Sequence, residues 1–192
     1  AGYAEHLSPT GDNLPLVVQY MFENHREVFK EVLEKMKMRV PGVSDVQAES
    51  TVDGRIVLRF QDGSFKDPFI SSYVSDGTIK MFAYLVLLHD PDPHPLLCIE
   101  EPENQLYPSL LLELLDEFRL YARKGGQVFV SSHSPDLLNG ATPDEVFWLV
   151  KKAGYTHIER ASKHREIVAM FEEGEKLGYL WKENFLRGSH PE

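Results

Sequence analysis

The chain has 192 residues, of which 42% are hydrophobic and 26% charged; this suffices for one compact domain and excludes disordered and collagen-like classes. Its longest apolar runs, Phe82–Leu88 and Leu96–Ile99, are too short to cross a membrane. A net charge of −10, with no run of Lys and Arg, makes the chain by itself a poor candidate for direct nucleic-acid binding. The single cysteine, Cys98, cannot form an internal disulfide, so we expect a reducing, cytoplasmic location.

The first part of the chain alternates turn signals with regular patterns. Residues 1–13 are rich in turn formers and are expected to form an exposed loop. Apolar residues at helical spacing then predict one long helix over Leu14–Met38, with Asn13 as its N-cap. The apolar face of this helix has two possible roles: packing against residues 43–60, or binding a partner.

A hairpin is predicted next. Segments of β-type composition, Val43–Thr51 and Arg55–Phe60, flank Val52-Asp53-Gly54, and Asp-Gly is a strong signal for a hairpin. Residues 61–74 are expected to form a loop.

The central region predicts a strand–helix–strand unit. Ser75–Thr78 is expected to precede an apolar-periodic helix that runs through Leu88. After a proline-rich loop, the unbroken apolar run Leu96–Ile99 is typical of a strand buried on both faces. Pro108–Arg123 has the pattern of an amphipathic helix, and Gln127–Ser131 that of a second buried strand. The spacing predicts a parallel pair joined by a helical crossover. Further strands (Glu145–Val150, Thr156–Arg160) and helices (163–174, 176–186) are expected to follow.

Polar residues cluster where these two strands end. Glu100-Glu101 closes the first strand, and Ser131 begins the polar run Ser-Ser-His-Ser, which includes His133, at the end of the second. Because the carboxyl ends of parallel strands lie at one edge of a sheet, where α/β folds bind ligands, the two clusters predict a site. The alternative is that the two glutamates merely begin a solvated loop.

The segment Ser75-Asp76-Gly77-Thr78 at the start of a helix predicts a second feature. Ser75 or Asp76 can act as an ordinary N-cap. Gly77 disfavours a helix by up to about 1 kcal/mol relative to alanine, which is tolerable where something must approach the backbone closely. A helix N-terminus with hydroxyls and a bare glycine suits a phosphate.

Together these motifs resemble the ABC-type ATPases, most closely the soluble branch related to the RecF, SMC and OLD-family proteins. Val74–Thr78 is similar to the signature motif, Leu96–Asn104 to Walker B followed by the D-loop, and Val128–Pro135 to the strand with the switch histidine. The resemblance is clearest over residues 71–139. It implies a partial P-loop NTPase fold of the α/β class: a mainly parallel sheet with flanking helices, an antiparallel hairpin and a helical C-terminal tail.

The resemblance also implies a role for each motif residue in ATP hydrolysis. Glu100 would hold Mg²⁺, Glu101 would polarise the attacking water and His133 would contact the γ-phosphate. The signature residues (Ser75, Asp76, Gly77, Thr78) would bind ATP held by a second subunit, so the complete protein would be an ATP-bridged homodimer. Phosphoryl transfer needs mainly positioning and charge stabilisation, which these residue types supply.

Two replacements and one absence set the chain apart from the family pattern. Glu100 stands where the first Walker B carboxylate is usually aspartate, and Tyr107 replaces the aspartate that usually closes the D-loop. No Gly-Lys pair occurs in the sequence, so it contains no Gly-x-x-x-x-Gly-Lys-Ser/Thr P-loop. We therefore expect residues 1–192 to be one C-terminal lobe, inactive alone, whose P-loop half is missing. Within it we expect a helix and hairpin region over 1–70, a motif core over 71–160 and a helical tail over 161–192.

Relatives of the resembled family suggest DNA repair or phage defence, with a DNA or nuclease partner and no membrane. The main alternative is a non-catalytic dimerisation or binding module that completes the ATP site of another subunit. A Ser-His hydrolase is disfavoured because Ser132 and His133 are sequence neighbours. A metal site is disfavoured because the histidines are scattered along the sequence.

Overall fold

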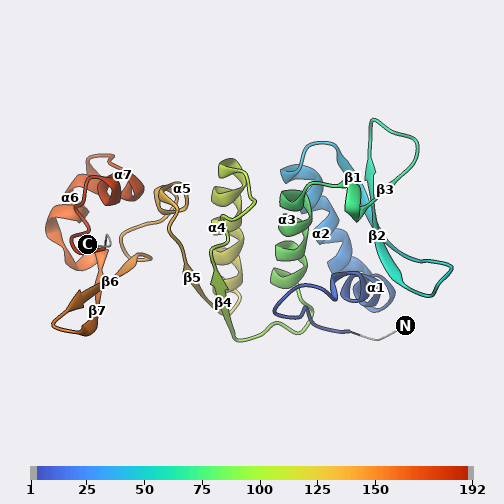
Figure 1. Cartoon of the computed structure of the whole chain (residues 1–192), viewed down its shortest axis with the longest axis horizontal. Coiled ribbons are helices and arrows are strands. Elements are labelled where there is room, and N and C mark those ends of the chain that lie inside the picture. The colour runs from blue at the N-terminus through green and yellow to red at the C-terminus, as the bar shows by residue number, and fades with distance from the viewer. Residues whose placement is uncertain (1–3, 190–192) are drawn as a thin grey trace. The chain divides into compact units, whose positions relative to one another are not determined.

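The computed structural model describes residues 4–189; expectations for residues 1–3 and 190–192 lie outside these residues. The described chain divides into two compact units. Unit 1 contains the chain up to Ile99 together with Asn104–Phe129, and unit 2 contains Glu100–Glu103 together with the chain from Val130 onward. Figure 1 labels the helices and strands and colours them in chain order from blue to red.

Unit 1 begins with two helices where the sequence predicted one. α1 (Leu14–Asn24) and α2 (Arg26–Arg39) are separated at His25, whose φ of −134° and ψ of 52° are not helical. The side-chain amide of Asn24 donates to the Tyr20 carbonyl over 3.1 Å, and the His25 ring forms a 3.1 Å hydrogen bond with the Tyr20 hydroxyl. Side chains that bond locally in this way offer the backbone an alternative to the helix, and apolar periodicity does not reveal them.

The N-terminal segment is held more tightly than its composition predicted. Asn13 does occupy the N-cap position of α1, but its side chain makes no cap hydrogen bond. Instead it accepts from the Ser8 backbone amide over 2.8 Å and donates to the His6 carbonyl over 2.9 Å. As a result, His6 and Ser8 are half-buried and not fully exposed.

The predicted hairpin is confirmed. β1 (Val43–Ser50) and β2 (Ile56–Asp62) pair antiparallel, with Ser50 opposite Ile56. The expected loop that follows holds a short third strand, β3 (Phe69–Ile70), antiparallel to β2, and a 3₁₀ turn over Ser71–Tyr73. A two-residue strand is too short for hydrophobic alternation to predict.

Helices cover this sheet and form the core of unit 1. α1 and α2 pack on β1, and α3 (Asp76–Leu88) contacts both α2 and α4 (Pro108–Arg123) (Figure 1). The apolar face predicted over residues 14–38 is therefore used for internal packing. The buried side chains of this core include Val17, Val18, Met21, Val32, Met36, Val46, Leu58, Phe82, Leu85, Leu111 and Leu114.

β4 (Leu96–Glu100) and β5 (Gln127–Ser131) form the predicted strand pair. The Gln127 amide donates to the Pro95 carbonyl in unit 1, and the Glu101 amide donates to the Ser131 carbonyl in unit 2, both over 2.9 Å. The two bonds follow the same chain order on both strands, as in a parallel pair. The prediction that both strands are buried on both faces is wrong. Leu96 on β4 is 47% exposed and Phe129 on β5 is 56% exposed, because one face of this strand pair is uncovered in unit 1.

The expectation of a mainly parallel sheet is also wrong for the described residues. β1–β2–β3 and β6–β7 are antiparallel, because hairpin turns join their main strands, and only β4–β5 has the helical crossover that a parallel pair needs.

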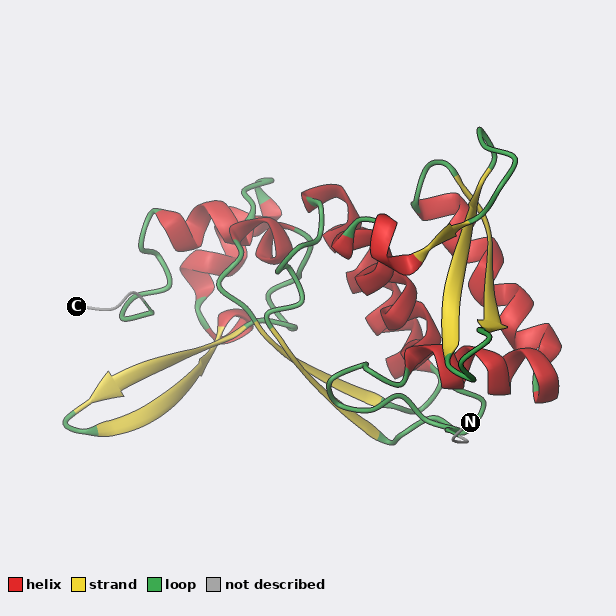
Figure 2. Cartoon of the chain, turned by 45° about the vertical axis from the view of Figure 1, so that its right-hand side comes forward, coloured by secondary structure: helices red, strands yellow, loops and turns green. Residues whose placement is uncertain are grey.

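Unit 2 has a small core of its own. β6 (Phe147–Lys152) and β7 (Tyr155–Arg160) form an antiparallel ribbon, drawn as long arrows in Figure 2. α5 (Pro135–Asn139) packs on α7 (Leu177–Lys182), and a 3₁₀ turn over Ala161–Lys163 leads into α6 (Arg165–Glu172). The buried core comprises Val146, Trp148, Val150, Ala161, Ile167, Leu177, Leu180 and Leu186. Among the described helices, none combines the length and apolar character needed to cross a membrane.

Candidate functional site

The first strand of the parallel pair ends abruptly at the predicted site. β4 ends at Glu100, and the next residue, Glu101, has a φ of 44°, in the left-handed region. Such a backbone is uncommon for a residue with a side chain and costs of order 1 kcal/mol. The turn means that Glu100 and Glu101 do not continue one extended strand, so alternation along a strand does not decide where their carboxylates point.

A carboxylate and two polar groups meet where the strands end. In unit 2, Glu103 Oε1 accepts a 2.6 Å hydrogen bond from the Ser132 hydroxyl and a 3.0 Å hydrogen bond from the His133 backbone amide. The other oxygen, Glu103 Oε2, is buried and has no hydrogen-bond partner among the described residues. The turn after β4 is thereby fixed to the polar run after β5.

Glu101 and Glu103 influence each other's ionisation. A hydrogen bond with Glu103, with burial and the negative charge of Glu103, raises the pKa of Glu101. Burial works against ionisation of Glu103, but hydrogen bonds from Ser132 and the backbone hold the pKa of Glu103 below its ordinary value. Carboxyl groups pushed apart in pKa at a strand edge are typical of functional sites.

His133 lies beside Glu101 and is exposed to solvent. Its Nε2 is 3.6 Å from Glu101 Oε1, and its side chain is 86% exposed, against 26% for Glu101. An exposed imidazole beside a carboxylate is free to contact a ligand arriving from solvent.

Glu100 takes no part in this cluster of interactions. It is the last residue of β4 and is exposed. The structure therefore brings together Glu101 and His133 of the predicted residues and leaves Glu100 exposed and outside their interactions.

The four predicted signature residues lie in unit 1, at the start of α3. Ser75 is the N-cap: its Oγ accepts from the Thr78 amide over 3.2 Å and is 2.8 Å from the Thr78 hydroxyl oxygen. Ser75 and Asp76 are exposed, whereas Gly77 is buried. The helix thus begins with solvent-facing hydroxyl and carboxyl groups.

Gly77 has a packing role that the sequence did not reveal. A Cβ atom at this position would lie 2.5 Å from the Gln105 carbonyl oxygen, too close for any side chain. Nearby, Lys80 Nζ donates to the Asn104 carbonyl over 2.7 Å. The segment Asn104–Leu106 is thus held directly against the first turns of α3.

Sequence reasoning missed Glu103 as a site residue, although it stands in the run resembling Walker B and the D-loop. Its signal would have been the Glu-x-Glu spacing from Glu101, which becomes meaningful only if the chain turns after the strand. The structure supplies that turn through the positive φ of Glu101.

The carboxylates of this cluster fit a magnesium ion in their chemistry. Mg²⁺ prefers oxygen ligands, including one or two carboxylates, and Glu101 and Glu103 offer these in the cluster, whereas Glu100 is next to Glu101 in the sequence but outside the cluster. The buried oxygen of Glu103 without a partner is a donor atom that a cation would satisfy.

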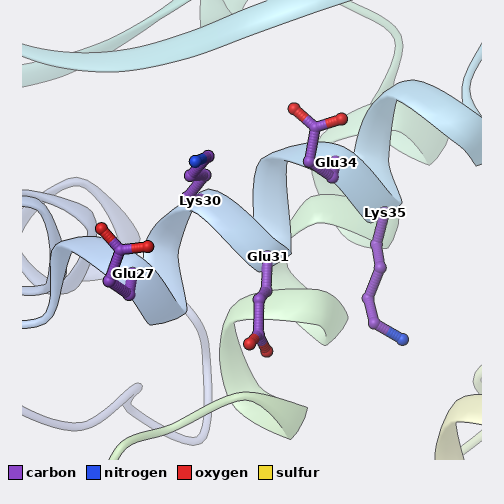
Figure 3. A pocket seen from close by; sticks show the side chains of 5 residues that line it. All are labelled: Glu27, Lys30, Glu31, Glu34 and Lys35. Carbon is purple, nitrogen blue, oxygen red and sulfur yellow. The ribbon is translucent and has the colours of Figure 1, made fainter.

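Two other arrangements do not compete with this site. The Ser132 hydroxyl bonds Glu103 instead of His133, so the pair does not form a Ser-His nucleophile. A hollow of about 410 Å³ lies along α2 and is lined by charged side chains of that helix, shown in Figure 3: Glu27, Lys30, Glu31, Glu34 and Lys35. An open surface on one helix offers little enclosure for a ligand.

Comparison with solved structures gives a likeness in fold to SMC ATPase heads. A chain from work on the ATP-driven dimerization and DNA-stimulated activation of SMC ATPases matches with a TM-score of 0.56 at 13% identity, over 82% of this chain and 99% of that one. An SmcHead bound to the C-winged helix domain of ScpA matches with a TM-score of 0.56 at 16% identity, over 80% and 47%.

A third match is the Smc head domain with an extended coiled coil bound to the C-terminal domain of ScpA, from Pyrococcus furiosus. Its TM-score is 0.58 at 12% identity, over 81% of this chain and 40% of that one. The chain therefore spans almost all of one relative and less than half of the other two. At such low identities the likeness concerns the fold alone.

A search of curated proteins finds no significant match. Residues 6–139, more than half of the chain, match the family described as "AAA domain, putative AbiEii toxin, Type IV TA system". The chain therefore belongs to this family of AAA domains, which are nucleotide-binding ATPases of the P-loop class, and its own fold is similar to that of SMC heads.

Proposed function

We propose that this chain is the C-terminal lobe of a magnesium-dependent ATPase that dimerises around ATP. The observation that carries the proposal is the group of Glu101, Glu103, Ser132 and His133 where β4 and β5 end. In the complete protein, Glu101 orients and polarises the water that attacks the γ-phosphate, and His133 contacts that phosphate. Glu103 holds the turn in place through Ser132.

Magnesium would be held by Glu100, directly or through water, and when bound it neutralises charge on the phosphates. The raised pKa of Glu101 suits a group that accepts a proton from water, because a weak acid is a stronger base. The open position of His133 supports contact with a phosphate that arrives from outside the lobe.

The start of α3 serves a second subunit in this proposal. Ser75, Asp76, Gly77 and Thr78 contact the nucleotide held by the partner, so ATP lies between two protomers. The exposed hydroxyl of Ser75 at a helix N-terminus supports this role, because such ends attract phosphate oxygens. Because Gly77 packs against the Gln105 carbonyl, a shift of the start of α3 on nucleotide binding would also move the segment Asn104–Leu106.

Alone, the lobe is catalytically incompetent, because its sequence contains no P-loop to hold the α- and β-phosphates. The uncovered apolar side chains Leu96 and Phe129 support a missing P-loop half that packs on this part of unit 1. The limited coverage of two SMC heads, 47% and 40%, is also consistent with a lobe.

The ATPase would work in the cytoplasm and would not bind a membrane. Its role would be in DNA repair or in phage defence. The family description names a toxin of a type IV TA system, which favours defence. With its net charge of −10, this chain would reach DNA through a partner or another segment, and a nuclease is the kind of partner we propose.

A calorimetric titration of the purified chain with Mg-ATP tests the lobe proposal, and we expect no detectable binding. In a polypeptide that carries both this chain and a P-loop half, Glu101→Gln should reduce turnover at least about 100-fold and leave Mg-ATP binding intact. Glu172→Gln, at an exposed position of α6, is the matched control and should leave both unchanged. Tight binding and hydrolysis by the chain alone, or normal turnover of the Glu101 variant, would refute the proposal.

The alternative function is a non-catalytic module that completes the ATP site of another subunit. It is favoured by the exposed N-terminus of α3, which needs no P-loop in its own chain. Under this alternative, Glu101→Gln leaves turnover unchanged and Ser75→Ala reduces it.

A further inference from the structure

Three potential metal ligands from distant parts of the sequence meet in unit 1. His6 comes from the N-terminal segment, and Asp90 and His94 come from the loop between α3 and β4. One ligand atom from each of the three lies within 4.8 Å of the others. His6 Nδ1 is 2.8 Å from Asp90 Oδ2, and the centroids of the His6 and His94 rings are 5.0 Å apart.

The surroundings of these side chains favour a cation. A cavity of about 110 Å³ is lined by Glu5, His6, Tyr20, His25, Asp90, Pro91 and Asp92, none of which is Lys or Arg. The carboxylates of Glu5, Asp90 and Asp92 in this lining favour a bound metal ion electrostatically.

The backbone around the ligands is already fixed. The Tyr121 hydroxyl on α4 donates to the His94 carbonyl, and the Asp92 amide donates to Asp90 Oδ1 over 2.9 Å. Asn13 binds the carbonyl of His6. A hydrogen bond therefore holds the segment around each ligand in place. This lowers the conformational entropy that the chain loses when it binds a metal ion.

We propose that His6, Asp90 and His94 bind one divalent transition-metal ion, with zinc as the best fit. Imidazole with one carboxylate suits zinc better than magnesium, which prefers oxygen ligands. Zinc bonds of about 2.0–2.2 Å place tetrahedral ligand atoms about 3.4 Å apart, so closing the site requires side-chain movements of about 1 Å. His94 is exposed on a loop and can make this movement, and water completes the coordination.

Bound zinc would join the N-terminal segment to the loop that leads into β4. The segments are 84 residues apart at the His6–Asp90 contact. Because the unfolded chain lacks this site, binding would stabilise the folded unit. This site is separate from the proposed nucleotide chemistry and does not depend on it.

The test is a titration of the metal-free, tag-free chain with zinc near neutral pH, by calorimetry and by thermal unfolding. We expect one high-affinity ion per chain and a rise in Tm of about 5 °C when zinc is in large excess over Kd. His94→Ala should weaken binding at least about tenfold and remove the shift, because it removes one of three ligands without touching the His6–Asp90 pair. Asp90→Asn should also weaken binding.

His157→Ala, an exposed histidine on β7, is the matched control and should bind zinc like the parent chain. Cobalt as a spectroscopic probe should give visible absorption bands that His94→Ala abolishes. Absence of zinc binding to the parent chain would overturn the proposal, as would a stoichiometry and Tm shift that His94→Ala leaves unchanged. In either case His6 and Asp90 form only an ion pair.

Discussion

Units 1 and 2 each contain a cluster of charged side chains, and the two clusters are built in opposite ways. In unit 1, Glu117 is 3% exposed and binds Lys35 Nζ with both carboxylate oxygens, at 2.7 and 2.9 Å. Arg39 also binds Glu117, and the buried His89 approaches it within 3.8 Å. The carboxylate of Glu117 faces two cations, so the buried charges are paired, although Arg39 Nε is buried without a hydrogen-bond partner among the described residues.

In unit 2, the two negatively charged side chains Glu101 and Glu103 lie close together, and His133 beside Glu101 is exposed. Glu101 has a left-handed backbone, and a buried oxygen of Glu103 lacks a hydrogen-bond partner among the described residues. Like charges held close together and backbone strain persist where they serve a function, whereas paired buried charges serve the fold. The comparison teaches that ionic content alone does not mark a site; the lack of compensation does.

The largest effect should follow from breaking the compensated cluster. Glu117→Ala leaves Lys35 and Arg39 without their buried partner and should lower the free energy of unfolding by about 3–5 kcal/mol in urea denaturation. Glu113→Ala is the matched control on the same helix, because Glu113 is 52% exposed and also contacts Arg39, at 3.4 Å. That control should cost less than about 1 kcal/mol. Equal losses in the two variants would contradict the distinction between the clusters.

The pH dependence of stability should show the burial of His89. Burial lowers the pKa of His89, against a hydrogen bond to the Leu85 carbonyl. From about pH 6.5 downward the unfolded chain binds a proton that the folded chain resists, so this contribution to stability is present above pH 6.5 and is lost as the pH falls. His89→Gln should therefore be most destabilising above pH 6.5, and its difference from the parent chain should shrink in acid.

Urea unfolding at several pH values measures this trend, with His157→Gln as the exposed control. The raised pKa of His6 gives the opposite dependence, but it is common to both chains and cancels in the difference. A difference that grows as the pH falls would show that His89 is charged in the folded state.

The smallest effect on stability is expected at the uncompensated cluster. Glu103→Gln keeps the shape of the side chain and removes a like charge, so the free energy of unfolding should change by less than about 1 kcal/mol. The pKa of Glu101 should fall, because the hydrogen bond with Glu103 and the charge of Glu103 raise it. NMR titration of the side-chain carboxyl of Glu101 measures the shift, and an unchanged pKa would show that the two groups do not interact.

Several parts of the fold followed from local sequence patterns. The helix Pro108–Arg123, the hairpin around Asp53-Gly54 and the polar ends of the two central strands depend on periodicity and turn chemistry, which act between near neighbours. For the same reason, the sequence indicated that Glu101 and His133 lie at neighbouring strand ends.

Tertiary structure alone decided what depends on contacts between distant residues. The role of Glu103 depends on the turn at Glu101 and on Ser132, and the need for glycine at position 77 depends on the carbonyl of Gln105. The histidines that looked scattered in the sequence include His6 and His94, which the fold brings together around Asp90. The sequence by itself determined most of the segments that become helix and strand, because short-range periodicity and turn preferences act along the chain; it did not reveal the break at His25 or the short strand β3. Charge pairing, close packing of backbone against backbone and the geometry of a metal site depend on segments that are distant in the sequence and become neighbours only on folding.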